Sequence, residues 1–234
     1  MLLRKRHNKY CLINTVFEMP EMTAYSMAEI YGEYKKHRIC NNGVIKPHIL
    51  SDEFMKGHTP LIEYESTDYL SNYSNWSIYD KLYIQNNFIK YIYSEITDCD
   101  SILITGSMFL GSIYSLLIII NRILKTPEKE SKVNVNMTIT SNEKMIFRMQ
   151  PQVMRVDDYF LETYYLHKGE KHEIDFTFNA IDVEEINKFT NKFLGLFTSE
   201  NPRSKTPFLS VSYEETRKFY EFLIFKDRYL VTGN

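Results

Sequence analysis

Cysteine is scarce in this sequence, which has only Cys11, Cys40 and Cys99 among its 234 residues. The three are scattered and form no C-x-x-C pair, so the sequence indicates neither a disulfide framework nor a structural zinc site. Scattered cysteines of this kind are typical of reduced thiols in a cytosol. We therefore expect a cytoplasmic protein without a bound metal or other cofactor.

A charge excess of either sign is also missing. Lys and Arg total 28, and Asp and Glu total 30, which gives a formal net charge of -2. Proteins that bind nucleic acid broadly carry a basic field, so this balance disfavours a nucleic-acid partner. The chain is 44% hydrophobic and 25% charged, which is typical of a folded protein and not of a disordered one.

Complete catalytic motifs are absent from the sequence as well. The six histidines form no H-x-x-x-H or H-E-x-x-H pattern, and no G-x-S-x-G sequence is present. The sequence therefore gives no support for covalent catalysis, nor for a metal site built from neighbouring residues.

The longest segment without charge runs from residue 101 to residue 121. As a single helix, residues 102–120 are apolar enough to span a membrane, which needs about 20 residues. As protein core, the same segment divides into a short strand, a turn at Gly106 and Ser107, and a buried helix over residues 108–124. The apolar part of that helix is closer in length to a core helix than to a span. We favour the core interpretation, and membrane anchoring is the alternative.

Periodicity predicts a helix-rich first half. Apolar residues recur at spacings of three and four over residues 22–36 and again over residues 77–96. Together with the buried helix at 108–124, these segments predict a helix-rich α/β unit over residues 1–126.

The period changes after the charged linker at residues 125–132. Apolar and polar residues then alternate over 133–140, which is the pattern of a strand buried on one face only. Three further strands are predicted at 145–149, 159–166 and 172–178. Four successive strands predict an antiparallel meander.

Two amphipathic helices complete the predicted unit over residues 132–234. Each begins with an expected capping sequence, Asp-x-x-Glu from Asp182 and Ser-x-x-Glu from Ser212. The predicted fold class is therefore α+β, an antiparallel β-meander packed with amphipathic helices and preceded by a helix-rich N-terminal half. Residues 1–126 and 132–234 form either two domains or one continuous domain.

A possible phosphate site lies between the predicted strand at 101–105 and the helix that follows it. Gly106 and Gly111 are spaced as in a P-loop, whose backbone cradles phosphate at a helix N-terminus. However, Ser112 stands where a P-loop requires lysine. Gly106, Ser107 and Gly111 are thus candidate phosphate-binding residues, and a tight packing turn is the alternative.

Four carboxylates are candidates for catalysis: Asp157, Asp158, Glu173 and Asp175. Carboxylates on adjacent strands can bind magnesium and position a water against a phosphodiester. This interpretation gives a metal-dependent nuclease or nucleotide-processing enzyme, with magnesium as its cofactor. In the alternative, Glu173 and Asp175 form the solvated face of a half-buried strand.

Side chains suited to protein recognition gather in two predicted loops, one polar and aromatic and one basic and bracketed by prolines. Aromatic side chains give a large contact area at low entropic cost. The Asn and Thr side chains that alternate over residues 133–140 offer a further polar surface. The candidate interaction residues in the two loops are Tyr69, Tyr73, Trp76, Arg203 and Lys205. Because no catalytic motif is complete, the sequence favours a non-enzymatic interaction or assembly subunit that contacts a protein partner or a second copy of itself.

Overall fold

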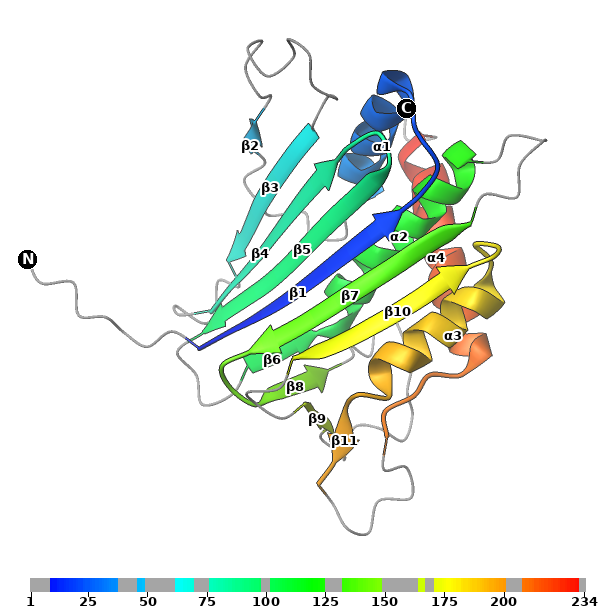
Figure 1. Cartoon of the computed structure of the whole chain (residues 1–234). Helices are drawn as coiled ribbons and strands as arrows, with labels where there is room; N and C mark the ends of the chain where they lie inside the picture. Colours follow the sequence, from blue (N-terminus) through cyan, green and yellow to red (C-terminus); the bar gives the residue numbers. More distant parts are fainter. Residues whose placement is uncertain are drawn as a thin grey trace, which may run out of the picture.

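The computed structural model describes most of the chain as two sheets and four helices (Figure 1). The α+β class predicted from the sequence is confirmed, with an antiparallel sheet packed against helices. The described residues are 9–37, 46–48, 62–69, 76–97, 102–124, 132–148, 164–166, 171–200 and 208–231.

The larger sheet has seven strands, all antiparallel to their neighbours, in the order β10-β7-β1-β5-β4-β3-β2. Strand β1 lies inside the sheet and pairs with β5 on one side and with β7 on the other. Strands from distant parts of the sequence therefore lie side by side. The seven strands are β1 (Lys9–Glu18), β2 (Lys46–His48), β3 (Ile62–Tyr69), β4 (Trp76–Ile84), β5 (Phe88–Thr97), β7 (Val133–Ser141) and β10 (His172–Phe178).

The predicted helix over residues 77–96 is wrong, because this segment forms the hairpin of β4 and β5. Its apolar residues fit both the helical and the strand period, and its many Ile and Tyr residues favour a strand. The backbone N–H of Gln85 donates to the carbonyl of Phe88 at 2.9 Å and closes the turn. The first half of the chain is thus less helical than predicted. The buried side chains alternate along the two strands, as they do in a sheet: Leu82, Ile84, Ile89, Tyr91 and Tyr93.

A smaller, four-stranded sheet has the order β11-β9-β8-β6. The predicted meander is therefore wrong in its pairing, since β7 and β10 are neighbours in the large sheet while β8 and β9 belong to the small one. Strands β6 and β8 are parallel. Both sheets contain strands from before and after residues 125–131. The four strands are β6 (Ile102–Thr105), β8 (Met145–Arg148), β9 (Tyr164–Leu166) and β11 (Thr198–Ser199).

All four helices lie on one face of the large sheet (Figure 1). The central one is α2, which contacts both α1 and α4, and α3 packs beside α4 and β10. The opposite face of the sheet is turned toward the viewer in Figure 1. The helices are α1 (Ala24–His37), α2 (Gly106–Leu124), α3 (Val183–Leu194) and α4 (Tyr213–Val231).

The uncharged segment forms the core helix α2, as the sequence predicted within two residues. Every residue from Phe109 to Ile120 is buried. A helix that is apolar on all sides must be covered on all sides, and here α2 is covered by the rest of this chain. In the part of the chain that the structure describes, no helix is long and apolar enough to cross a membrane.

Both predicted helix caps are confirmed. The side chain of Asp182 accepts a hydrogen bond from the backbone N–H of Glu185 at 2.9 Å. At α4, the Ser212 hydroxyl accepts from the backbone N–H of Glu215 at 3.2 Å, and the Glu215 carboxylate accepts from the backbone N–H of Ser212 at 2.8 Å. These bonds satisfy N–H groups that have no partner within a helix.

A buried polar contact joins α2 to α3. Thr190 donates its hydroxyl proton to the Ile186 carbonyl at 2.7 Å, so Tyr114 is the donor in the 2.6 Å hydrogen bond between its hydroxyl and Thr190 Oγ1. Burial raises the pKa of Tyr114 to about 12. The tyrosine is therefore neutral across the physiological range of pH.

Candidate functional site

The outer face of the large sheet, opposite the helices, is the candidate functional site. Successive side chains of a strand point to opposite faces, so burying one set of side chains against the helices turns the alternate set outward. In the described part of the chain, no helix or strand packs on this outer face (Figure 1). Its described side chains are Leu12, Asn14, Val16 and Glu18 of β1, Lys81 and Tyr83 of β4, Phe88, Lys90, Ile92 and Ser94 of β5, Asn134, Asn136, Thr138 and Thr140 of β7, and Glu173, Asp175 and Thr177 of β10.

Strand register arranges these side chains in rows across the sheet. One row runs from β10 to β4 through Val16 and contains Asp175, Asn136, Val16, Lys90 and Tyr83. The next row runs through Asn14 and contains Glu173, Thr138, Asn14, Ile92 and Lys81. Each row therefore begins with an acid on β10, crosses neutral residues, and reaches a lysine on β5 or β4.

The central strands carry apolar side chains on this face. Leu12 and Val16 on β1 and Phe88 and Ile92 on β5 are all partly exposed. Each has polar neighbours on the same face, such as Asn14 between Leu12 and Val16. The outer face is thus a mixed surface, apolar at intervals in the middle and charged toward both sides.

Asp175 and Glu173 are held by neighbours along their own edge of the sheet. Asn136 Nδ2 donates to Asp175 Oδ1 at 2.7 Å, and Lys192 Nζ from α3 donates to the backbone carbonyl of Asp175 at 2.6 Å. Lys171 forms an ion pair with Glu173. Both carboxylates are exposed, as the solvated-strand interpretation of the sequence predicts.

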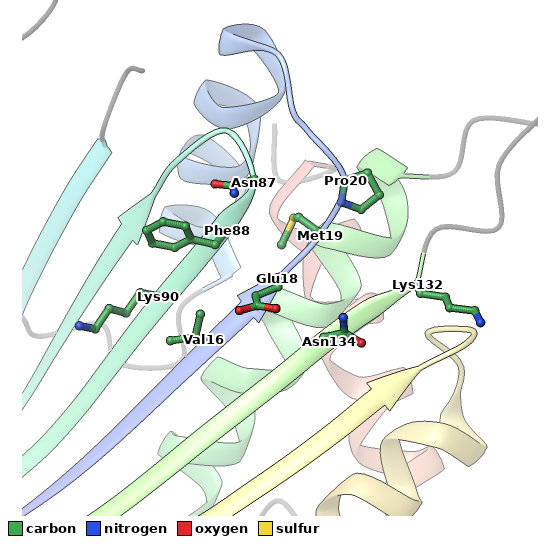
Figure 2. Close-up of a pocket in the computed structure, with 9 residues that line it drawn as sticks. All are labelled: Val16, Glu18, Met19, Pro20, Asn87, Phe88, Lys90, Lys132 and Asn134. Atoms are coloured by element: carbon green, nitrogen blue, oxygen red, sulfur yellow. The ribbon is translucent and has the colours of Figure 1, made fainter. Parts of the chain in front are cut away.

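A hollow of about 890 Å³ opens at one end of the outer face. It forms where β1 ends, beside the β4–β5 turn and the start of β7. Figure 2 shows Glu18 between Lys90 on one side and Lys132 on the other. The hollow is lined by Val16, Glu18, Met19, Pro20, Asn87, Phe88, Lys90, Lys132 and Asn134.

The four carboxylates predicted for catalysis are only partly visible in the structure. Glu173 and Asp175 are two residues apart on the same face of β10, whereas Asp157 and Asp158 lie outside the described residues. Among the residues that the structure describes, no group of three His, Cys, Asp or Glu side chains could hold a metal ion. The metal-dependent enzyme therefore stays a prediction of the sequence.

The three candidate phosphate-binding residues lie in one helix. Gly106 and Ser107 form the first turn of α2, which follows β6 with no residue between them. Gly111 is buried in the next turn. The predicted turn at Gly106 and Ser107 is therefore helical, and Gly111 is part of the packed interior.

The predicted interaction residues fall at the ends of strands or outside the described residues. Tyr69 ends β3 and Trp76 begins β4, so both belong to strands and not to a loop. Tyr73, Arg203 and Lys205 lie outside the described residues. The Asn and Thr face of β7, which the sequence also singled out, lies next to the centre of the outer face.

No protein-family model, curated protein or solved structure matches this chain.

Proposed function

We propose that this chain is a non-enzymatic interaction or assembly subunit, and that it binds a protein partner through the outer face of its large sheet. The observation that carries the proposal is the set of partly exposed apolar side chains on β1 and β5, in the middle of a face that no described element covers. An antiparallel sheet often has one solvated face, but that face is usually polar. Apolar groups surrounded by polar and charged ones are typical of protein interfaces.

The charge distribution supports a protein over a nucleic acid as the partner. A surface that binds a polyanion collects lysine and arginine, whereas this face carries Glu173 and Asp175 on one side and Lys81 and Lys90 on the other. A partner must therefore match both signs of charge, as a protein surface does.

We propose the cytoplasm as the place where this subunit acts. Cys11 is a buried thiol, which is compatible with a reducing compartment. The finding that no described helix could span a membrane agrees with this proposal.

Site-specific photo-crosslinking tests the proposal in the cells that make this protein. A benzophenone amino acid at Ile92, in the middle of the outer face, is expected to yield a crosslinked protein adduct. The same amino acid at Lys218, which is exposed on α4 in the helical layer, is the control and is expected to yield none. Equal yields at both positions, or no protein adduct at Ile92, would refute this use of the face.

A further inference from the structure

We propose that the partner of the outer face is the outer face of a second copy of this chain, with a two-fold axis along β1. This inference rests on the proposed function and specifies its partner. It is drawn from the charge pattern of the face, its size and the residues nearest its centre.

Among the side chains that the structure describes, the charge pattern is complementary to itself in one of the two face-to-face orientations that keep the strands aligned. Rotation about an axis parallel to β1 places β7 against the second copy's β5, and β10 against the second copy's β4. Because β10 and β4 each lie two strands from β1, at about 10 Å, the acidic edge of each copy then faces the basic side of the other. Rotation about an axis perpendicular to the strands would instead place each acidic edge against itself.

This rotation leaves the position of each row along the strands unchanged, so each row faces the same row of the second copy. Glu173 faces the second copy's Lys81, since both lie in the row of Asn14. Asp175 and Lys90 lie in one row, on β10 and β5. In the dimer, Asp175 is therefore displaced by one strand spacing from the second copy's Lys90. The two-fold axis repeats each pairing, which gives four opposite-charge pairs in the dimer.

The residues on the axis meet their own copies. Val16 and Leu12 each face their counterparts and bury apolar surface. Asn14 lies between them, but its side-chain oxygen is buried within its own chain and adds no contact across the axis. The apolar contacts of Val16 and Leu12 are therefore the ones that stabilise the centre of the dimer.

The hollow also contributes to the fit. Glu18 lies on the axis at the end of β1, where it would approach the second copy's Glu18. Lys90 and Lys132 flank Glu18 in each copy, so four lysines surround the two carboxylates in the dimer (Figure 2). The like charges on the axis are thus compensated by lysines from both copies.

The size of the face matches that of a stable dimer. The five strands from β10 to β4 make a surface about 24 Å wide and about 30 Å long, or about 700 Å². Specific interfaces commonly bury about 800 Å² on each partner. Sheets that pack face to face keep their strands within about 30° of one another, which the proposed axis allows.

Charge-reversed variants of the full chain test this dimer by sedimentation velocity of the purified protein. The wild-type chain is expected to sediment as a dimer at micromolar concentration, and the dimer should weaken as salt rises. Glu173→Lys with Asp175→Lys makes all four facing pairs repulsive, as does Lys81→Glu with Lys90→Glu. Each double variant is expected to dissociate at least about a hundredfold more readily than the wild type.

The decisive sample is an equimolar mixture of the two double variants. Each copy then presents the charges that the other has lost, so a heterodimer is expected although each variant alone is a monomer. The matched control is Glu184→Lys with Lys218→Glu, which reverses exposed charges in the helical layer and should leave the dimer unchanged. Circular dichroism of every variant verifies that it is folded.

Other results overturn the dimer, and the crosslink from Ile92 decides whether the proposed function fails with it. A wild-type chain that stays monomeric at about 100 μM, while Ile92 still crosslinks to another protein, refutes the second copy as the partner and leaves the face as an interface. A dimer that both double variants preserve refutes this face and this axis. A monomer together with no crosslink from Ile92 refutes both proposals.

Discussion

Tyr114→Phe tests the buried polar contact between α2 and α3 by removing a single oxygen atom. The Tyr114 hydroxyl donates to Thr190 Oγ1 at 2.6 Å, and both side chains are fully buried. Thr190 keeps its own donation to the Ile186 carbonyl in the variant, so its hydroxyl proton stays satisfied. We therefore expect Tyr114→Phe to lower the free energy of unfolding at pH 8 by about 1 kcal/mol, the net value of an ordinary hydrogen bond.

The same substitution should change the pH dependence of stability. Burial raises the pKa of Tyr114 from 10.0 to about 12 in the folded protein. Because the folded-state pKa is above the unfolded value, this contribution to stability is complete below pH 10 and is lost as pH rises toward 12. The loss is about 1.4 kcal/mol for each pH unit in that window, or about 2.7 kcal/mol in all. The phenylalanine variant has no such loss, so it should equal the wild type at about pH 11 and exceed it at higher pH.

Urea unfolding of both proteins at pH 8, 10, 11 and 11.5 measures this inversion. The matched control is Thr190→Val, which removes the acceptor and leaves the Tyr114 hydroxyl buried. It should cost about 1–3 kcal/mol and keep the alkaline loss of stability. A difference between wild type and Tyr114→Phe that stays constant from pH 8 to pH 11.5 would refute the account of a buried, neutral tyrosine.

Three further predictions concern the helical layer, and each is measured by urea unfolding near neutral pH. Asn191→Leu should cost about 2–3 kcal/mol, because the Asn191 side chain accepts from the Val211 backbone N–H at 2.7 Å and donates to its carbonyl at 2.9 Å; a cost below 0.5 kcal/mol would contradict these bonds. Ser212→Ala should cost about 1 kcal/mol by removing the cap of α4, while Ser212→Gly costs only a few tenths, and equal losses would count against capping. Phe193→Ala should lower the free energy of unfolding by about 3–5 kcal/mol, because this ring is fully buried. Phe222→Ala, at a ring that is 48% exposed, should change it by no more than about 0.5 kcal/mol. Similar values for the two variants would show that burial does not determine the loss of stability.

Sequence patterns correctly predicted two kinds of feature: those formed by residues that are neighbours in sequence, and segments with a clear pattern of burial. The helix cap at Ser212 needs only residues three positions apart, and the structure confirms it. The alternation over 133–140 predicted β7, and the uncharged segment predicted α2. A surface that must be buried is apolar in the sequence, and this pattern does not depend on which other element covers it. The helix prediction for residues 77–96 was wrong because the apolar positions of this segment fit both the helical and the strand period.

Strand pairing could not be predicted in this way, because it depends on contacts between residues that are distant in sequence. β8 has the alternation of a hairpin partner for β7, yet it pairs with β6 in the other sheet. Parts of the outer face were predicted at β7, where Asn134 and Asn136 stand out as polar, and at β10, where one interpretation gave Glu173 and Asp175 as a solvated face. Its apolar centre could not be predicted, because Leu12 and Val16 look like core residues until the helices are known to lie on the other side.

The position of β1 between β5 and β7 has a consequence for how the protein is made. Leu12 pairs with Thr140, 128 residues further along the chain. At about 5–20 residues per second, translation takes roughly 6–26 seconds to deliver that partner after β1 has been synthesised. During this interval the newly made sheet ends at β1, whose bare edge is open to other nascent chains or to a chaperone.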